Sequence, residues 1–160
     1  MRKVLLAAML AVPVFGFSQS LDAKFEAKNG KFQESFSNDT ISVSAFVTRN
    51  DMTIFIVNLL DERMYVEWEN FRWDGSHIAF NTDSRLSMRN PKADEVIMGK
   101  ESSHKTIMRK DNIRSNYISS WYDYKTKTAD GATNTSLILP IRFSNGTIKD
   151  YKLTVLITKK

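Results

Sequence analysis

Segments in which apolar residues alternate with polar ones recur along most of this chain. In residues 40–48 every second position is apolar, namely Ile41, Val43, Ala45 and Val47, and Ser42, Ser44, Phe46 and Thr48 face the other way. Residues 53–60 are mostly β-branched or aromatic, and such side chains pack well on a pleated sheet but lose rotamer freedom in a helix. Side chains that alternate between two faces predict β-strands with one buried and one solvated side.

The stretch from Met52 to Gly75 is predicted to form the centre of the core as two neighbouring strands. The charged residues 61–63 separate its two apolar runs, and Met64, Val66 and Trp68 share one face of the second run. Asp and Gly in residues 73–76 supply a turn, because Asp bonds its own backbone and Gly accepts positive φ. The polar residues 49–51 are a typical hairpin connection, so the strands on either side of them are expected to be antiparallel neighbours.

The C-terminal segments predict a long hairpin. Residues 136–143 and 148–158 flank Ser144-Asn145-Gly146-Thr147, and Asn-Gly suits the positive φ values of a tight turn. In the last strand the inward face is expected to hold Tyr151, Leu153, Val155 and Ile157. Pro140 has no backbone donor, which favours a place at a sheet edge or a bulge.

Other segments give weaker patterns. Residues 19–39 are interpreted as a polar lead-in with at most one short edge strand, and residues 77–80 and 85–88 as short outer strands. Residues 92–105 are expected to be a loop with at most one short strand, near 96–98. Two further extended segments are predicted at 105–108 and 116–124.

Seven to nine short strands without a helical period predict an all-β fold, an antiparallel immunoglobulin-like sandwich over residues 40–160, with an up-and-down barrel as the alternative. The order of an apolar strand ending near Asn58, Val66-x-Trp68, Asp74-Gly75, Thr106-Ile107 and Leu139-Pro140-Ile141 resembles that of small exported immunoglobulin-like proteins of unknown function from Gram-negative bacteria. The resemblance implies a fold and a compartment, and it implies no catalytic residues.

Residues 1–18 are predicted to be a signal peptide. Arg2 and Lys3 precede an apolar run of about 11 residues, which is too short for a membrane span of about 20, and small residues follow. Gln19 is the expected mature start, and we expect export to the periplasm or cell surface with no integral membrane span. Without the signal, 21 Lys and Arg face 18 Asp and Glu, and their scattered mixture disfavours nucleic acid as a partner.

The sequence contains no pattern that predicts catalysis. It has no cysteine, so thiolate chemistry and Cys-ligated zinc are excluded, and the histidines His77 and His104 are too far apart in sequence for a short two-histidine metal motif. Asp74, Ser76 and His77 have the residue types of a triad, but triad members normally converge from separate elements, and a four-residue turn cannot orient all three. Glu67 and Glu69 are interpreted as a solvated face and not as a glycosidase pair. We therefore expect no enzyme, no metal and no cofactor.

The function expected from these features is an exported binding or protein-interaction module, with an envelope or surface protein as partner. The alternative is a carbohydrate-binding module that uses Trp121, Tyr122 and Tyr124. Strand alternation would send Trp121 inward and leave Tyr122 and Tyr124 as an exposed pair. Asp39-Thr40-Ile41 resembles a bacterial O-glycosylation acceptor, which is a further hypothesis.

Overall fold

The computed structural model describes residues 21–82, 92–113 and 131–159, and the regular secondary structure of this part of the chain is almost entirely β-strand. The all-β prediction is confirmed. The strands are β1 (Leu21–Glu26), β2 (Phe32–Gln33), β3 (Ser35–Ser37), β4 (Ile41–Val47), β5 (Met52–Asn58), β6 (Met64–Val66), β7 (Arg72–Trp73), β8 (Ser76–Phe80), β9 (Glu95–Ile97), β10 (Ser102–Arg109), β11 (Thr133–Phe143) and β12 (Ile148–Lys159), with one short 3-10 helix, η2 (Lys110–Asn112), after β10.

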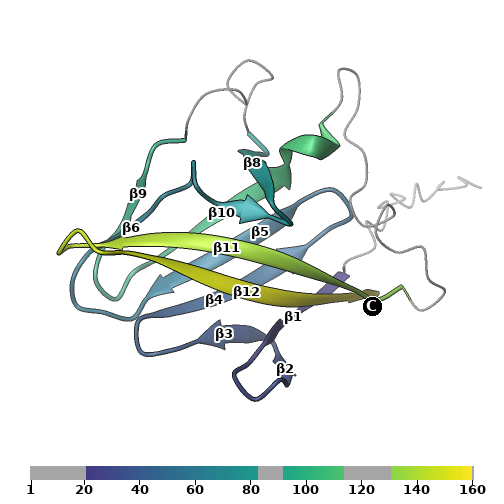
Figure 1. The fold of residues 1–160 in the computed structure, drawn as a ribbon, viewed down its shortest axis with the longest axis horizontal. Coiled ribbons are helices and arrows are strands. Elements are labelled where there is room, and N and C mark those ends of the chain that lie inside the picture. The colour runs from purple at the N-terminus through teal and green to yellow at the C-terminus, as the bar shows by residue number, and fades with distance from the viewer. Residues whose placement is uncertain (1–20, 83–91, 114–130, 160) are drawn as a thin grey trace, which may run out of the picture.

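The sheet closes into a barrel, so the predicted immunoglobulin-like sandwich is wrong. Eight strands follow one another in the order β12-β1-β4-β5-β10-β8-β7-β11, and β11 pairs with β12 to complete the circuit (Figure 1). All of these pairings are antiparallel. The connections are not simply up and down, because β10 lies between β5 and β8. A sandwich and a barrel both require alternating faces, so alternation could not distinguish them.

The barrel includes a strand from the segment interpreted as a polar lead-in. β1 pairs with β12 over residues 21–25 and reaches β4 at Leu21, which lies opposite Val47. Leu21, Ala23 and Phe25 are buried. β2 returns along β1, and β3 pairs with β4. The segment thus holds three strands where one was expected, because only three inward apolar residues mark β1 and charged residues separate them.

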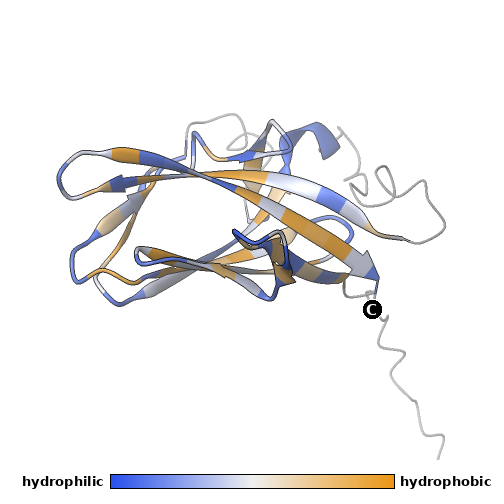
Figure 2. Cartoon of the chain, turned by 60° about the horizontal axis from the view of Figure 1, so that its bottom comes forward, coloured by the Kyte–Doolittle hydropathy of each residue, from blue (hydrophilic) through white to orange (hydrophobic). Residues whose placement is uncertain are grey.

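The interior of the barrel is filled by side chains. Along the strands, hydrophobic residues alternate with hydrophilic ones (Figure 2). The largest fully buried side chains include Trp68, Trp73, Phe25 and Phe71. Trp68 is 1% exposed, which confirms its predicted place in the core. The inward face predicted for the last strand is also confirmed, since Tyr151, Leu153, Val155 and Ile157 are all buried.

The predicted pairing of the two central strands is wrong. β5 pairs with β4 and β10, whereas β6 lies outside the closed circuit and pairs with β11 and β9. Asn58, fully buried at the end of β5, redirects the chain there. Its amide nitrogen donates to the carbonyl oxygens of Glu62 at 2.7 Å, Ile97 at 3.2 Å and Met98 at 3.1 Å, and its oxygen accepts from Leu60 N at 3.0 Å. Such a network fixes a loop in place of a hairpin.

Both predicted hairpins are confirmed. β4 and β5 are antiparallel neighbours, and β11 and β12 pair over ten residues around a turn in which Gly146 has φ +84°. Pro140 lies within an interior strand, not at an edge or a bulge. It stands where β11 changes partner on one side, from β7 at Ile138 to β6 at Ile141. A residue that cannot donate is tolerated at such a change of partner.

Candidate binding surface

The aromatic residues proposed as a binding site, Trp121, Tyr122 and Tyr124, lie outside the described residues. The same holds for the strand expected at 85–88, the extended segment at 116–124 and the signal sequence at 1–18. The short strand expected near residues 96–98 is confirmed by β9. The strand expected at 105–108 is confirmed within β10, which begins earlier, at Ser102.

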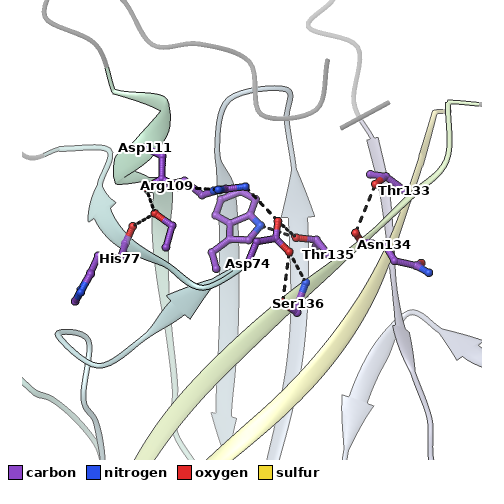
Figure 3. A network of polar contacts seen from close by, with 10 residues as sticks. Asp74, His77, Arg109, Asp111, Thr133, Asn134, Thr135 and Ser136 are labelled. Carbon is purple, nitrogen blue, oxygen red and sulfur yellow. Dashed lines mark hydrogen bonds and ion pairs between the residues drawn. The ribbon is translucent and has the colours of Figure 1, made fainter. Parts of the chain in front are cut away.

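The structure does not bring Asp74, Ser76 and His77 together as a triad. Asp74 and Gly75, with φ +49° and +78°, form the two-residue turn between β7 and β8, as the Asp-Gly pair predicted. The Ser76 hydroxyl lies against a carboxylate oxygen of Asp111 and the carbonyl of His77. The His77 ring is exposed and points away from the Ser76 hydroxyl and from Asp74 (Figure 3). No imidazole is therefore placed to take the Ser76 proton.

Asp74 instead ties the turn to two neighbouring strands. Its carboxylate accepts from Ser136 N at 2.9 Å and from the Thr135 hydroxyl at 2.9 Å, and it lies 3.3 Å from the guanidinium of Arg109 (Figure 3). Arg109 also pairs with Asp111 at 2.8 Å. Hydrogen bonds from Ser76 and Arg109 lower the pKa of Asp111, Ser76 contributing most. The groups of this network bind one another, which suits a structural role.

Glu95 is the acceptor in a second polar cluster, between β9 and β10. It accepts from the Trp68 indole N–H at 2.8 Å and from Ser103 Oγ at 2.5 Å, and it pairs with Lys105 Nζ at 3.0 Å. Burial acts to raise the pKa of Glu95, but the hydrogen bonds from Ser103, Lys105 and Trp68 outweigh it and lower that pKa. Among the described residues β9 pairs by backbone only with β6, so these side-chain bonds join it to β10.

The glutamates Glu67 and Glu69 do not form a catalytic pair. Glu67 lies 3.2 Å from Arg142 Nε, and the same guanidinium binds Asp94 at 2.5 Å and stacks over the Tyr65 ring at 4.2 Å. Glu69 is exposed in the following turn. These contacts hold β6 against β11. The pair therefore lacks the facing geometry that two glycosidase carboxylates need.

On the outside of the barrel, two phenylalanines and a histidine form a diagonal line across β4, β5 and β10. Phe46 is 48% exposed and Phe55 40% exposed. The ladder sets Phe46 opposite Thr53, two residues from Phe55, so the two rings are diagonal neighbours on one face. His104 lies opposite Phe55, and the two rings stack with centroids 5.5 Å apart at 24°. Phe46, Phe55 and His104 lie at the centre of a surface that we call the aromatic face.

The residues around this line carry no formal charge, and all of them except Val57 carry a hydroxyl group. The ladders of β3, β4, β5 and β10 place on this side Ser35, Ser37, Ser42, Ser44, Thr53, Val57, Ser102 and Thr106. The hydroxyls of Thr53 and Thr106 are 2.8 Å apart. Within these ladder positions there is no Asp, Glu, Lys or Arg, although 26% of the chain is charged. An uncharged face with exposed rings is typical of a surface that contacts something else.

Sequence reasoning did not single out this surface, although the signal was present. Alternation placed Phe46 on the solvated side of its strand, and one exposed aromatic needs no explanation. Bringing the three rings together requires the registers of β4, β5 and β10, and the pairing of β5 with β10 joins residues 52–57 to the distant residues 102–107. In the described ranges, no helix has the length and apolar character to cross a membrane. The same ranges contain no cluster of three or more potential metal ligands.

Comparison with known proteins assigns the chain to no group. No protein-family model matches it, and neither a curated protein nor a solved structure is significantly similar to it.

Proposed function

We propose that this protein is an exported, non-catalytic binding module of the periplasm or cell surface that contacts a partner protein through the aromatic face. The observation that carries the proposal is the line of Phe46, Phe55 and His104 on a closed barrel. Aromatic side chains supply large contact area at small cost in conformational entropy and dominate the energetics of many interfaces. A closed barrel holds them in fixed positions.

The polar networks support a non-catalytic role. The carboxylates of Asp74, Glu95 and Glu67 are each occupied by donors of the fold itself. A general base needs a free lone pair directed at a substrate, and a nucleophile needs a base within hydrogen-bond reach. These three carboxylates thus serve to join strands.

A carbohydrate ligand is the alternative, and the hydroxyl groups around the aromatic face favour it. A sugar ring could stack on Phe55 while Ser44 or Thr53 exchanged hydrogen bonds with its hydroxyls. The aromatic residues 121, 122 and 124 remain a second candidate for such a platform. A large neutral face suits a neutral glycan as well as it suits a neutral protein surface.

Site-specific photo-crosslinking tests the protein-partner proposal. A benzophenone amino acid replaces Phe55 in the full chain, expressed in a Gram-negative host, and a second chain carries it at Glu69, which is exposed and lies off this face. We expect one discrete envelope protein to crosslink from position 55 and not from position 69. The crosslink should be lost when Phe46→Ser is added. Equal products from both positions would contradict the proposal.

Glycan-array binding separates the two ligand classes. Glycan binding that disappears in Phe55→Ala, with the circular dichroism spectrum unchanged, would favour a carbohydrate ligand over a protein partner. Binding that disappears only in Trp121→Ala would move the site to the other aromatic cluster.

Export is tested on the same cells. We expect the protein outside the cytoplasm with Gln19 or a close neighbour as its first residue, because the charged start and short apolar run fit signal peptidase. An intact mass that retains Met1 to Ser18 would show that the segment is not a signal.

A further inference from the structure

The first half of β12 has a backbone edge without a ladder. Residues 148–157 pair with β11 on one side, whereas on the other side β1 pairs only with residues 155–159. Within the described ranges, no strand pairs with residues 148–154 on that second side. Every second residue of such an edge presents an N–H and a C=O that another strand can bind. Figure 1 shows this half of the hairpin reaching the end of the molecule, away from β1.

Charges of both signs lie along this edge. Tyr151 and Leu153 point into the core, so Asp150 and Lys152 point outward with Ile148 and Thr154. Ile148 is 54% exposed, the largest exposure among the large apolar side chains of the described residues. Lysines alone on an edge discourage pairing. An aspartate two residues from a lysine instead selects a partner with the opposite order of charges.

A second copy of the chain supplies that order. When two such edges run antiparallel about a twofold axis at Tyr151, residue 150 of each copy lies opposite residue 152 of the other. Residues directly opposite in an antiparallel pair share a face, so two Asp150–Lys152 pairs form across the axis. Ile148 then meets Thr154 of the other copy. Self-complementarity of this kind is what a twofold interface requires.

We propose that the protein forms a twofold dimer in which residues 148–154 of β12 pair with the same residues of a second copy, in the register set by Asp150 and Lys152. The contact is separate from the aromatic face, so either can hold without the other. It joins two barrels through backbone hydrogen bonds, and it covers the exposed side chain of Ile148.

Charge reversal tests the register. The full chain is expressed, purified and followed by sedimentation velocity over a wide range of concentration, where we expect a dimer that dissociates on dilution. Asp150→Lys and Lys152→Asp should each weaken the dimer at least about tenfold, because like charges directly opposite are destabilising and the twofold axis doubles the effect. Glu69→Lys and Lys28→Asp, which make the same charge changes at exposed sites off this edge, should leave it intact.

Complementation gives the decisive result. An equimolar mixture of Asp150→Lys and Lys152→Asp chains should dimerise again, since each variant then faces its opposite, and the double swap within one chain should restore the homodimer. Both single variants keep a positive net charge, as the parent does at +5, so overall attraction cannot explain recovery. A chain that is monomeric at every concentration overturns the proposal and leaves the edge to an extended segment of another protein. A dimer that is indifferent to these reversals, or a mixture that stays monomeric, overturns it equally.

Discussion

Replacing Trp68 by phenylalanine should weaken the fold through the loss of one hydrogen bond to a charged group. The indole N–H donates to Glu95 at 2.8 Å, and the ring packs against Phe71 and Phe80 with centroids 5.6 and 5.5 Å away. A hydrogen bond to a charged group contributes about 1.5 to 3 kcal/mol. Glu95 keeps two other donors and is 22% exposed, which favours the lower end of that range.

Trp68→Phe should lower the free energy of unfolding by about 2 to 3 kcal/mol in total, once the smaller size of the phenylalanine ring is included. Trp68→Ala, which also leaves a cavity, should lower it by about 3 to 5 kcal/mol. Trp73→Phe is the matched control. Trp73 is equally buried, and its N–H donates at the same distance, 2.8 Å, to the neutral hydroxyl of Thr135.

Urea unfolding followed by far-ultraviolet circular dichroism measures the free energy of unfolding of Trp68→Phe and Trp73→Phe as a function of pH. The cost of Trp68→Phe should shrink as the pH falls through the lowered pKa of Glu95, because protonation removes the charge that strengthens the bond. The cost of Trp73→Phe should change little, since its acceptor does not titrate. A Trp68→Phe cost that is the same at neutral and acid pH, or below about 0.5 kcal/mol throughout, would refute the assignment of this bond as a significant one.

Four further substitutions probe single features. Glu95→Gln should lower stability at neutral pH and make the loss of stability in acid less steep. A carboxylate with a lowered pKa stabilises the fold above its unfolded pKa of about 4.3, and this contribution is lost as the pH falls through its folded pKa. Melting temperatures of both proteins measured over a pH series would show this difference. Tyr151→Phe should leave stability unchanged or raise it by about 1 kcal/mol, since this buried hydroxyl has no hydrogen-bond partner among the described residues; a large loss in denaturant unfolding would reveal a hidden partner. Gly99→Ala should cost more than about 2 kcal/mol because its Cβ would run into the backbone of Asp61, whereas Gly146→Ala meets open space and should cost only about 1 kcal/mol for its positive φ; equal melting temperatures would contradict this order.

What sequence predicted well is local. The β11–β12 hairpin needs only an alternating run, a turn at Asn145-Gly146 and a second run, all within a short stretch of chain. The inward face of β12 follows from the same alternation. Trp68 is buried as predicted, although it lies in the turn after β6 and not on the strand face that alternation gave it.

What sequence missed is the identity of neighbours. β5 and β6 follow one another in the chain, but β5 takes β10 as its second neighbour and β6 takes β9 and β11. The turn at Asn58 that separates them depends on the carbonyl oxygens of Ile97 and Met98, some forty residues away. Closure of the barrel likewise depends on β1, whose three inward residues gave too weak a pattern to reveal it. The aromatic face could not be predicted for the same reason, since its residues come together only when the pairing registers of β4, β5 and β10 are all known.

The contact between β9 and β10 affects where the protein can open locally. Backbone ladders join the strands of the closed circuit, whereas the side chain of Glu95 joins β9 to β10. Side-chain bonds of this kind can break without unzipping a backbone ladder, so the side of β9 that faces β10 can open locally while the circuit, and the pairing of β6 with β11, stay intact. Amide protons of β9 should therefore exchange with solvent sooner than those in the middle of β11, and acid should widen that difference by releasing Glu95.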